Sequence, residues 1–109
     1  MGVIETTGFK VGHSVEFITN RLPATAGTYL AGDLLQKNAT TGNLEKCTAE
    51  ANFCAIAVDD STVTTDGNVM AVYLTGMFDL EKLPDASTFD EVLLRNAGRV
   101  YNIFFAETK

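Results

Sequence analysis

The feature that most constrains the fold is a long apolar run over residues 69–80, which turn-forming residues precede. Both sets of alternate positions in this run are apolar, with Val72 and Leu74 in one set and Tyr73 and Met77 in the other. A strand with apolar residues on both faces is typical of a strand that is buried on both sides. The sequence therefore predicts a buried strand here.

A second apolar run, over residues 53–58, predicts another buried strand, and the composition agrees with a fold rich in strands. The chain of 109 residues contains 14 Thr, 9 Val and 4 Ile, whose branched β-carbons favour strands and disfavour an all-helical bundle. Hydrophobic residues make up 46% and charged residues 20%, as in ordinary globular proteins. A chain of this length has room for one hydrophobic core.

The first part of the chain alternates between apolar and polar residues. Its apolar positions are Phe9, Val11, Val15 and Phe17. This alternation predicts a strand with one apolar face, on which His13 also lies. Residues 19–27 lack periodicity and predict an extended connector. We therefore expect residues 1–25 to form an extended N-terminal segment or arm, and residues 26–109 to form a β-rich domain.

Shorter strands and turns are predicted in the first half of that domain. Residues 29–36 are typical of a strand that Gly32 interrupts, and residues 38–43 are typical of a turn. The turn leads into a strand over residues 44–47, so we expect a hairpin. Residues 59–67 are rich in Asp and Thr and predict an exposed loop.

One helix is predicted, over residues 88–97. Thr88 followed by Glu91 matches a capping box, and Ser87 is an alternative N-cap. The apolar residues expected on one face of this helix are Phe89, Val92 and Leu93. Gly98 is expected to end it.

Residues 100–105 predict a final strand after the helix. Taken together, these elements predict a mainly β domain, barrel-like or sandwich-like, with one short C-terminal helix and an extended N-terminal segment. We find no internal repeat.

The charge pattern limits the partners that we expect. The net charge is −6, and residues 59–91 hold eight acidic residues and one basic residue. Because proteins gain affinity for phosphates through Lys and Arg, nucleic acid is not an expected partner. Charged residues interrupt the start of the chain, and no apolar run approaches 18 residues, so we expect neither a secretion signal nor contact with a membrane. We also expect no cofactor and no bound metal.

Few residues are candidates for catalysis. Cys47 and Cys54 match neither a zinc motif nor a disulfide framework, and we expect two reduced thiols. Asp59 and Asp60 form an adjacent pair of aspartates, which is expected to be exposed where a strand ends. With His13 as a general base, this pair defines the alternative of a small hydrolase, which we disfavour. No catalytic residue is therefore expected.

Three strings resemble the lambda-type head decoration proteins, the capsid cement proteins of tailed bacteriophages. They are AGTYLAGDLL at residues 26–35, AIAVDD with GNVMAVYLTGMF at residues 55–78, and LLRNAGRVY at residues 93–101. Their order and spacing carry the resemblance, which covers about residues 26–105. The resemblance implies a β-rich fold with a small helix, and assembly into homotrimers on the outside of an expanded capsid.

In that family the protein stabilises the shell against the pressure of packaged DNA. The expected partner is therefore the major capsid protein, and the expected location is the virion surface after synthesis in the host cytoplasm. The expected contact residues are Phe9, Val11, Val15 and Phe17, although these four suit an ordinary internal strand equally well. A small β-barrel connector or tail accessory module of a phage particle remains an alternative.

Overall fold

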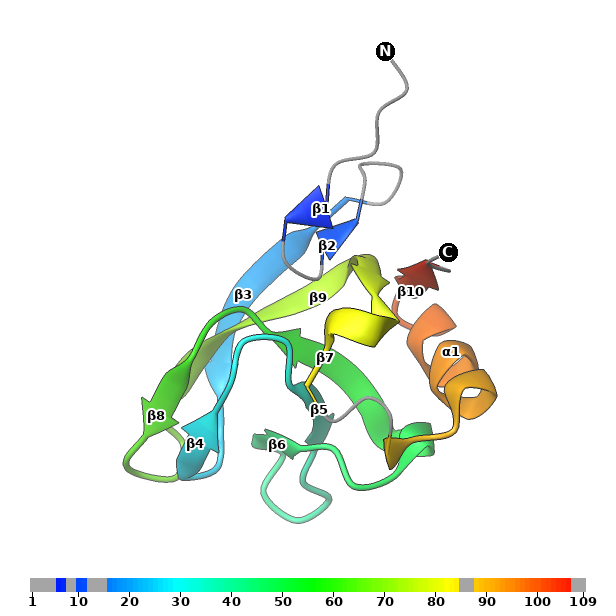
Figure 1. Ribbon diagram of the computed structural model, residues 1–109. Coiled ribbons are helices and arrows are strands. Elements are labelled where there is room, and N and C mark those ends of the chain that lie inside the picture. Colours follow the sequence, from blue (N-terminus) through cyan, green and yellow to red (C-terminus); the bar gives the residue numbers. More distant parts are fainter. Residues whose placement is uncertain (1–5, 8–9, 12–15, 85–87, 107–109) are drawn as a thin grey trace.

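The computed structural model describes residues 6–7, 10–11, 16–84 and 88–106. The described part is mainly β with one α-helix, which confirms the predicted fold class (Figure 1). The strands are β1 (Thr6–Thr7), β2 (Lys10–Val11), β3 (Ile18–Pro23), β4 (Gly27–Tyr29), β5 (Leu34–Lys37), β6 (Leu44–Lys46), β7 (Phe53–Ala57), β8 (Ser61–Val63), β9 (Val69–Asp79) and β10 (Ile103–Ala106). The helices are η1 (Glu50–Asn52), η2 (Leu80–Lys82) and α1 (Glu91–Arg99).

The central element is β9, the strand predicted from the long apolar run. Its first part pairs antiparallel with β3 on one side and with β7 on the other. Its second part pairs in parallel with β10 and meets β2 opposite Phe78. The sheet continues from β7 to β5 and then to β6, so the predicted hairpin over residues 29–47 is confirmed for β5 and β6.

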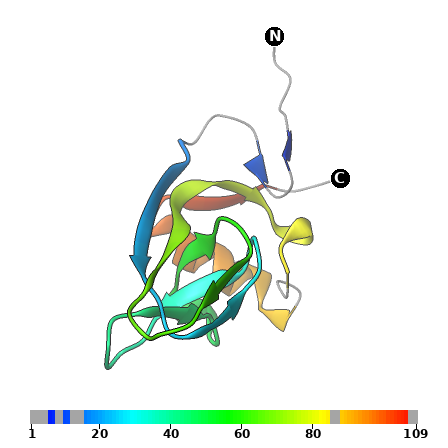
Figure 2. The ribbon, with the colours of Figure 1, turned by 90° about the vertical axis from the view of Figure 1, so that its left-hand side faces the viewer.

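The sheet closes on itself at one end. Ala24, directly after β3, forms a parallel bridge with Leu44 of β6. The Thr25 amide donates to the Leu44 carbonyl at 2.8 Å. Strands β3, β9, β7, β5 and β6 therefore form a small barrel, in which the end of β3 meets β6 (Figure 2).

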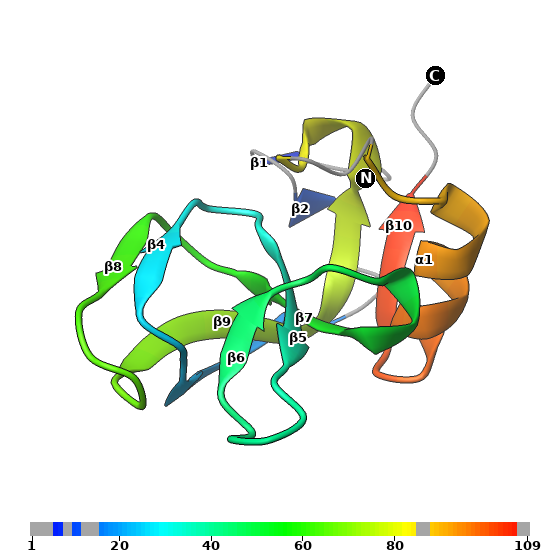
Figure 3. The ribbon, with the colours of Figure 1, turned by 90° about the horizontal axis from the view of Figure 1, so that it is seen from below.

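Both faces of β7 and of most of β9 are buried, as the apolar runs predict. Residues on one face, such as Phe53 and Tyr73, pack with Leu94 of α1 in one cluster. Residues on the other face, such as Val72, pack with Tyr29 of β4 in a second cluster. The molecule thus has three layers, with α1 on one side of the sheet and the β4–β8 ribbon on the other (Figure 3).

The β4–β8 ribbon occupies part of the region predicted to be a loop. Ser61–Val63 pairs with Gly27–Tyr29 along its whole length. The loop prediction over residues 59–67 is therefore wrong for β8, because Val63 is apolar and its side chain is buried against the sheet. The interrupted strand near Gly32 is two strands, β4 and β5, and Gly32 has a positive φ of 89° in the turn between them.

The N-terminal region differs from its prediction in two ways. Ile18–Pro23 is a strand that pairs with β9 from Thr75 to Val69, and not the extended connector predicted over residues 19–27. Part of the segment predicted to be an arm therefore belongs to the sheet. The strand predicted from Phe9 to Phe17 is not continuous in the described residues, since Glu16 and Phe17 lie between strands.

The helix begins later than predicted, at Glu91. Its N-cap is Asp90, whose carboxylate accepts from the Leu93 amide at 3.1 Å, so neither Thr88 nor Ser87 takes this role; Ser87 lies outside the described residues. Phe89 before the cap packs in the same cluster as Leu94, the arrangement of a hydrophobic staple.

The face of α1 that packs on the sheet also differs from the prediction. Leu94 and Gly98 are buried, whereas Val92 and Leu93 are exposed. Gly98 does not end the helix but lies inside it. A side chain does not fit at this position, because a Cβ would be 2.6 Å from the Ile103 carbonyl oxygen. This close approach brings α1 and β10 together, and Asn102 makes the turn between them with a positive φ of 63°.

Candidate functional site

The N-terminal segment carries the residues predicted to contact a capsid: Phe9, Val11, Val15 and Phe17. Phe9, Val15 and the candidate base His13 lie outside the described residues, and for Val11 the structure gives the backbone in β2. β2 pairs with β1 and is registered with β9 through Lys10 and Phe78. In Figure 1 these two short strands lie at the end of the molecule away from the β4–β8 ribbon.

Phe17 packs into the protein itself. Its ring meets Tyr73 and Phe78 edge-on, with centroid distances of 6.0 and 5.5 Å. It also lies directly over Gly76, where a Cβ would be 2.4 Å from the Phe17 Cδ1 atom. Phe17 therefore contributes to the packing of the domain, and its contact with a capsid stays a prediction.

Thr75 fixes the backbone on both sides of Phe17. Its hydroxyl donates to the Glu16 carbonyl at 2.5 Å and accepts from the Ile18 amide at 3.2 Å. The pairing register of β3 shifts directly after Ile18. Residues 16–18 are thus held against β9 by the hydrogen bonds of the Thr75 hydroxyl and by the aromatic contacts of Phe17.

The sequence contains a signal for this contact within the apolar run of β9. Thr75 and Gly76 interrupt the apolar run of β9 with a polar residue and a residue without a side chain. In a strand interior, glycine often marks the close approach of another group. Here that group is the Phe17 ring, which is far from Gly76 in the sequence.

We expect Gly76→Ala to lower the free energy of unfolding by about 2 kcal/mol, because the added methyl group overlaps the Phe17 ring and φ is 146° at this position. Urea denaturation measures this loss. Gly67→Ala is the matched control: φ is +94° there, but a Cβ would meet no atom within 4 Å. In a Phe17→Leu background the cost of Gly76→Ala should shrink. Equal costs at both glycines would show that backbone strain alone is responsible.

The acidic residues of the predicted loop stabilise turns of the β4–β8 ribbon. Asp60 accepts from the Ala31 amide at 2.8 Å, and Asp66 accepts from the Ala26 amide at 2.7 Å. Asp59 accepts from the Ser61 hydroxyl at 3.3 Å. Asp59 and Asp60 are exposed, as predicted, and they bond to different partners. Within the described residues, no group of three or more His, Cys, Asp or Glu side chains is placed to hold a metal ion.

Both cysteines are free thiols in the structure. Burial raises the pKa of Cys47 and of Cys54 above the ordinary value for a thiol, which favours the protonated form. The Cys47 thiol donates to the Ala49 carbonyl at 3.0 Å. Protonated thiols are poor nucleophiles and poor metal ligands, so these environments favour a packing role.

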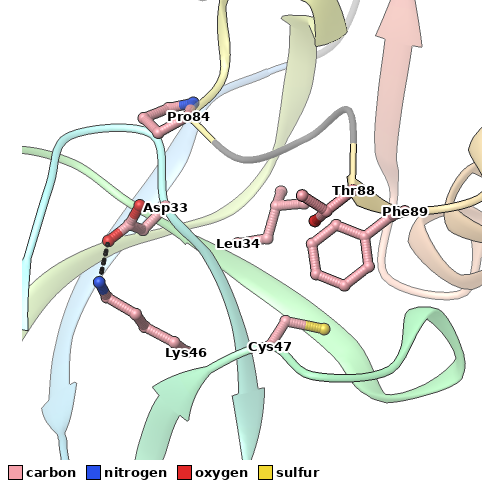
Figure 4. A pocket seen from close by; sticks show the side chains of 7 residues that line it. All are labelled: Asp33, Leu34, Lys46, Cys47, Pro84, Thr88 and Phe89. Carbon is pink, nitrogen blue, oxygen red and sulfur yellow. Dashed lines mark ion pairs between the residues drawn. The ribbon is translucent and has the colours of Figure 1, made fainter.

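A shallow pocket of about 200 Å³ lies between β5, β6 and the start of the α1 region (Figure 4). Leu34, Cys47 and Phe89 contribute its apolar lining. At its edge the buried Asp33 carboxylate faces the Lys46 ammonium at 3.7 Å and accepts from the Leu30 amide at 2.8 Å. Asp33 follows the turn at Gly32, and its bonds within the protein account for its burial.

Comparisons with known proteins add no relative. No protein-family model matches the chain, and no curated protein matches its sequence. Among the helices of the described residues, none has both the length and the apolar character needed to cross a membrane.

Proposed function

We propose that this protein is a structural component of a bacteriophage particle that binds the outer surface of the expanded capsid. It acts as a homotrimer, its partner is the major capsid protein, and it stabilises the shell against the internal pressure of the DNA. The observation that carries this proposal is the order and spacing of the three strings that resemble the lambda-type head decoration proteins.

In the structure, the three strings belong to elements that pack on one another. Residues 26–35 run from β4 to β5, residues 55–78 contain most of β7, β8 and β9, and residues 93–101 run from α1 to the turn before β10. The first two strings contribute residues to both apolar clusters, and the third contributes Leu94 to the cluster that contains Phe53. This supports the resemblance as one of a whole domain and not of isolated strings.

The N-terminal segment is the part that we propose for contact with the shell. Phe9, Val11 and Val15 supply its apolar face, and Phe17 fixes its base on β9. A trimer presents three such segments, so that binding of the first raises the effective concentration of the others. Because the protein would bind the expanded lattice and not its dissociated subunits, it would stabilise the lattice by linkage.

The net charge of −6 suits a protein on the outside of a capsid. Such a protein has no need to neutralise phosphates, and an acidic surface is repelled by nucleic acid. This agreement supports the outer surface over a position that touches packaged DNA.

Co-sedimentation with capsid shells tests this function. We expect the protein to pellet with expanded shells of its phage and to remain in the supernatant with unexpanded shells, because a cement protein recognises the mature lattice. Decorated shells should also survive heating that opens undecorated ones. Equal binding to both shell forms, or to neither, would contradict the proposal; binding to isolated tails or connectors would favour the alternative of an accessory module.

A further inference from the structure

The outer face of α1 is apolar although it faces solvent. Val92 and Leu93 are 65% and 53% exposed, and Val100, directly after the helix, is 75% exposed. At 100° per residue these three side chains lie on one side of the helix, opposite the buried Leu94. Four of the seven exposed large hydrophobic residues of the described part lie on α1 and the following turn, the fourth being Tyr101. Exposed apolar residues gathered in this way mark interaction surfaces.

A groove beside this face carries positive charge. It has a volume of about 240 Å³, and its lining includes Val92, Phe104 and two arginines. The Arg95 guanidinium is held by the Glu91 carboxylate at 2.8 Å and by the Phe105 carbonyl. Within the described residues, Arg99 makes no ion pair, and it is exposed. The groove thus combines apolar walls with a free cationic group at its edge.

The opposite side of the molecule has the complementary character. Asp59 and Asp60, directly before β8 of the β4–β8 ribbon, are exposed, and none of the ion pairs found among the described residues involves them. Residues 47–81 contain no Lys or Arg. Leu30, next to the bond between Asp60 and Ala31, is 45% exposed. This side is therefore acidic with an exposed apolar residue.

The two surfaces cannot meet within one chain, because the ribbon and α1 lie on opposite sides of the sheet (Figure 3). We propose that the groove of Val92, Arg95, Asn96, Arg99, Phe104 and Phe105 binds the acidic β4–β8 ribbon of a second copy of this chain. Such a contact joins different surfaces of the two copies, and contacts of that kind form a ring when the rotation closes. The proposal rests on the trimer of the proposed function and assigns its interface.

The apolar residues supply most of the affinity of such a contact, and the charges set its orientation. Arg99 would lie near Asp59 or Asp60 of the neighbouring copy. Charge pairs at the edge of an interface are weakened by salt. Self-association should therefore weaken as the salt concentration rises.

Sedimentation equilibrium of charge-reversal variants tests the interface. We expect the wild-type protein to approach three times the 11.7 kDa mass of the chain. Arg99→Glu and Asp59→Lys should each weaken association by about tenfold or more at low salt, because each places like charges together. The double variant should regain most of the lost association, since the reversed pair attracts again. Arg21→Glu, an equal charge change on β3, is the matched control and should have no effect.

The outcomes separate this interface from the proposed function. A wild-type trimer that all four variants leave intact would overturn the interface while the trimer and its capsid role stand. Two weakened single variants without recovery in the double variant would also overturn the pairing of these surfaces. A protein that stays monomeric would overturn both the interface and the trimer, and co-sedimentation with shells would then decide the capsid role.

Discussion

Val72→Asp is expected to unfold the protein. The Val72 side chain is fully buried in β9, between β3 and β7, and packs in the cluster that contains Tyr29 and Met70. A carboxylate at this position loses its hydration and gains no partner, which costs about 4 kcal/mol or more, close to the whole stability of a small domain. Circular dichroism and urea denaturation should show a chain without a cooperative transition.

The matched control is Val69→Asp, the same substitution on the same strand. Val69 is 46% exposed, so its carboxylate stays hydrated. We expect this variant to fold and to lose no more than about 1 kcal/mol. A native-like Val72→Asp protein, or an equal loss from both variants, would show that β9 is not the buried centre of the fold.

Elements buried on both faces were predictable because apolar residues occupy both sets of alternate positions in their sequences. This holds for β7 and β9, whose apolar runs match their packing between α1 and the β4–β8 ribbon. β3 has the opposite character, since Thr19, Asn20 and Arg21 are exposed. Its strand conformation comes from its hydrogen bonds to β9 and not from a pattern of its own. The sequence of residues 18–23 alone does not indicate that they pair with β9, about 50 residues later in the chain.

In the helix, apolar residues that are exposed led to a wrong prediction of the buried face. The apolar character of Val92 and Leu93 predicts that they lie on the buried face, but Leu94 and Gly98 are the buried residues of the helix. Two contacts determine which side of the helix faces the sheet. The Asp90 carboxylate caps the N-terminus of the helix, and Gly98 approaches Ile103 closely near its C-terminus. Both depend on neighbours in space. The apolar residues left on the outside are those from which we infer a partner.

The candidate site was predictable only in part. The alternation of apolar residues up to Phe17 predicts a segment with one apolar face. It does not predict that Phe17, the last of these residues, packs on the domain itself. The contacts of Phe17 with Tyr73 and Gly76, and those of Thr75 with Glu16 and Ile18, join parts of the chain that the sequence separates widely. They hold Glu16, Phe17 and Ile18 against β9.

Removing residues 1–15 is therefore expected to abolish binding to expanded shells while the domain stays folded. The cut removes β1 and β2, whose pairing with β9 is limited to Lys10 opposite Phe78. It leaves Glu16 and Phe17 in place, so the hydrogen bonds of Thr75 and the aromatic contacts remain. Because three segments would act together in a trimer, their loss should lower retention on shells by about a hundredfold or more. Co-sedimentation measures retention, and urea denaturation should show a change in stability of about 1 kcal/mol or less.

A full-length variant shows whether shell binding depends on the apolar side chains of the segment or only on the presence of the segment. Phe9→Ser, Val11→Ser and Val15→Ser together keep the chain and remove its apolar face, and we expect a loss of shell binding close to that of the deletion. Phe17→Ala should act differently, because it removes an internal contact and lowers stability before it affects binding. A truncated protein that still binds shells would place the capsid contact elsewhere on the domain. One that fails to fold would show that residues before Glu16 belong to the core.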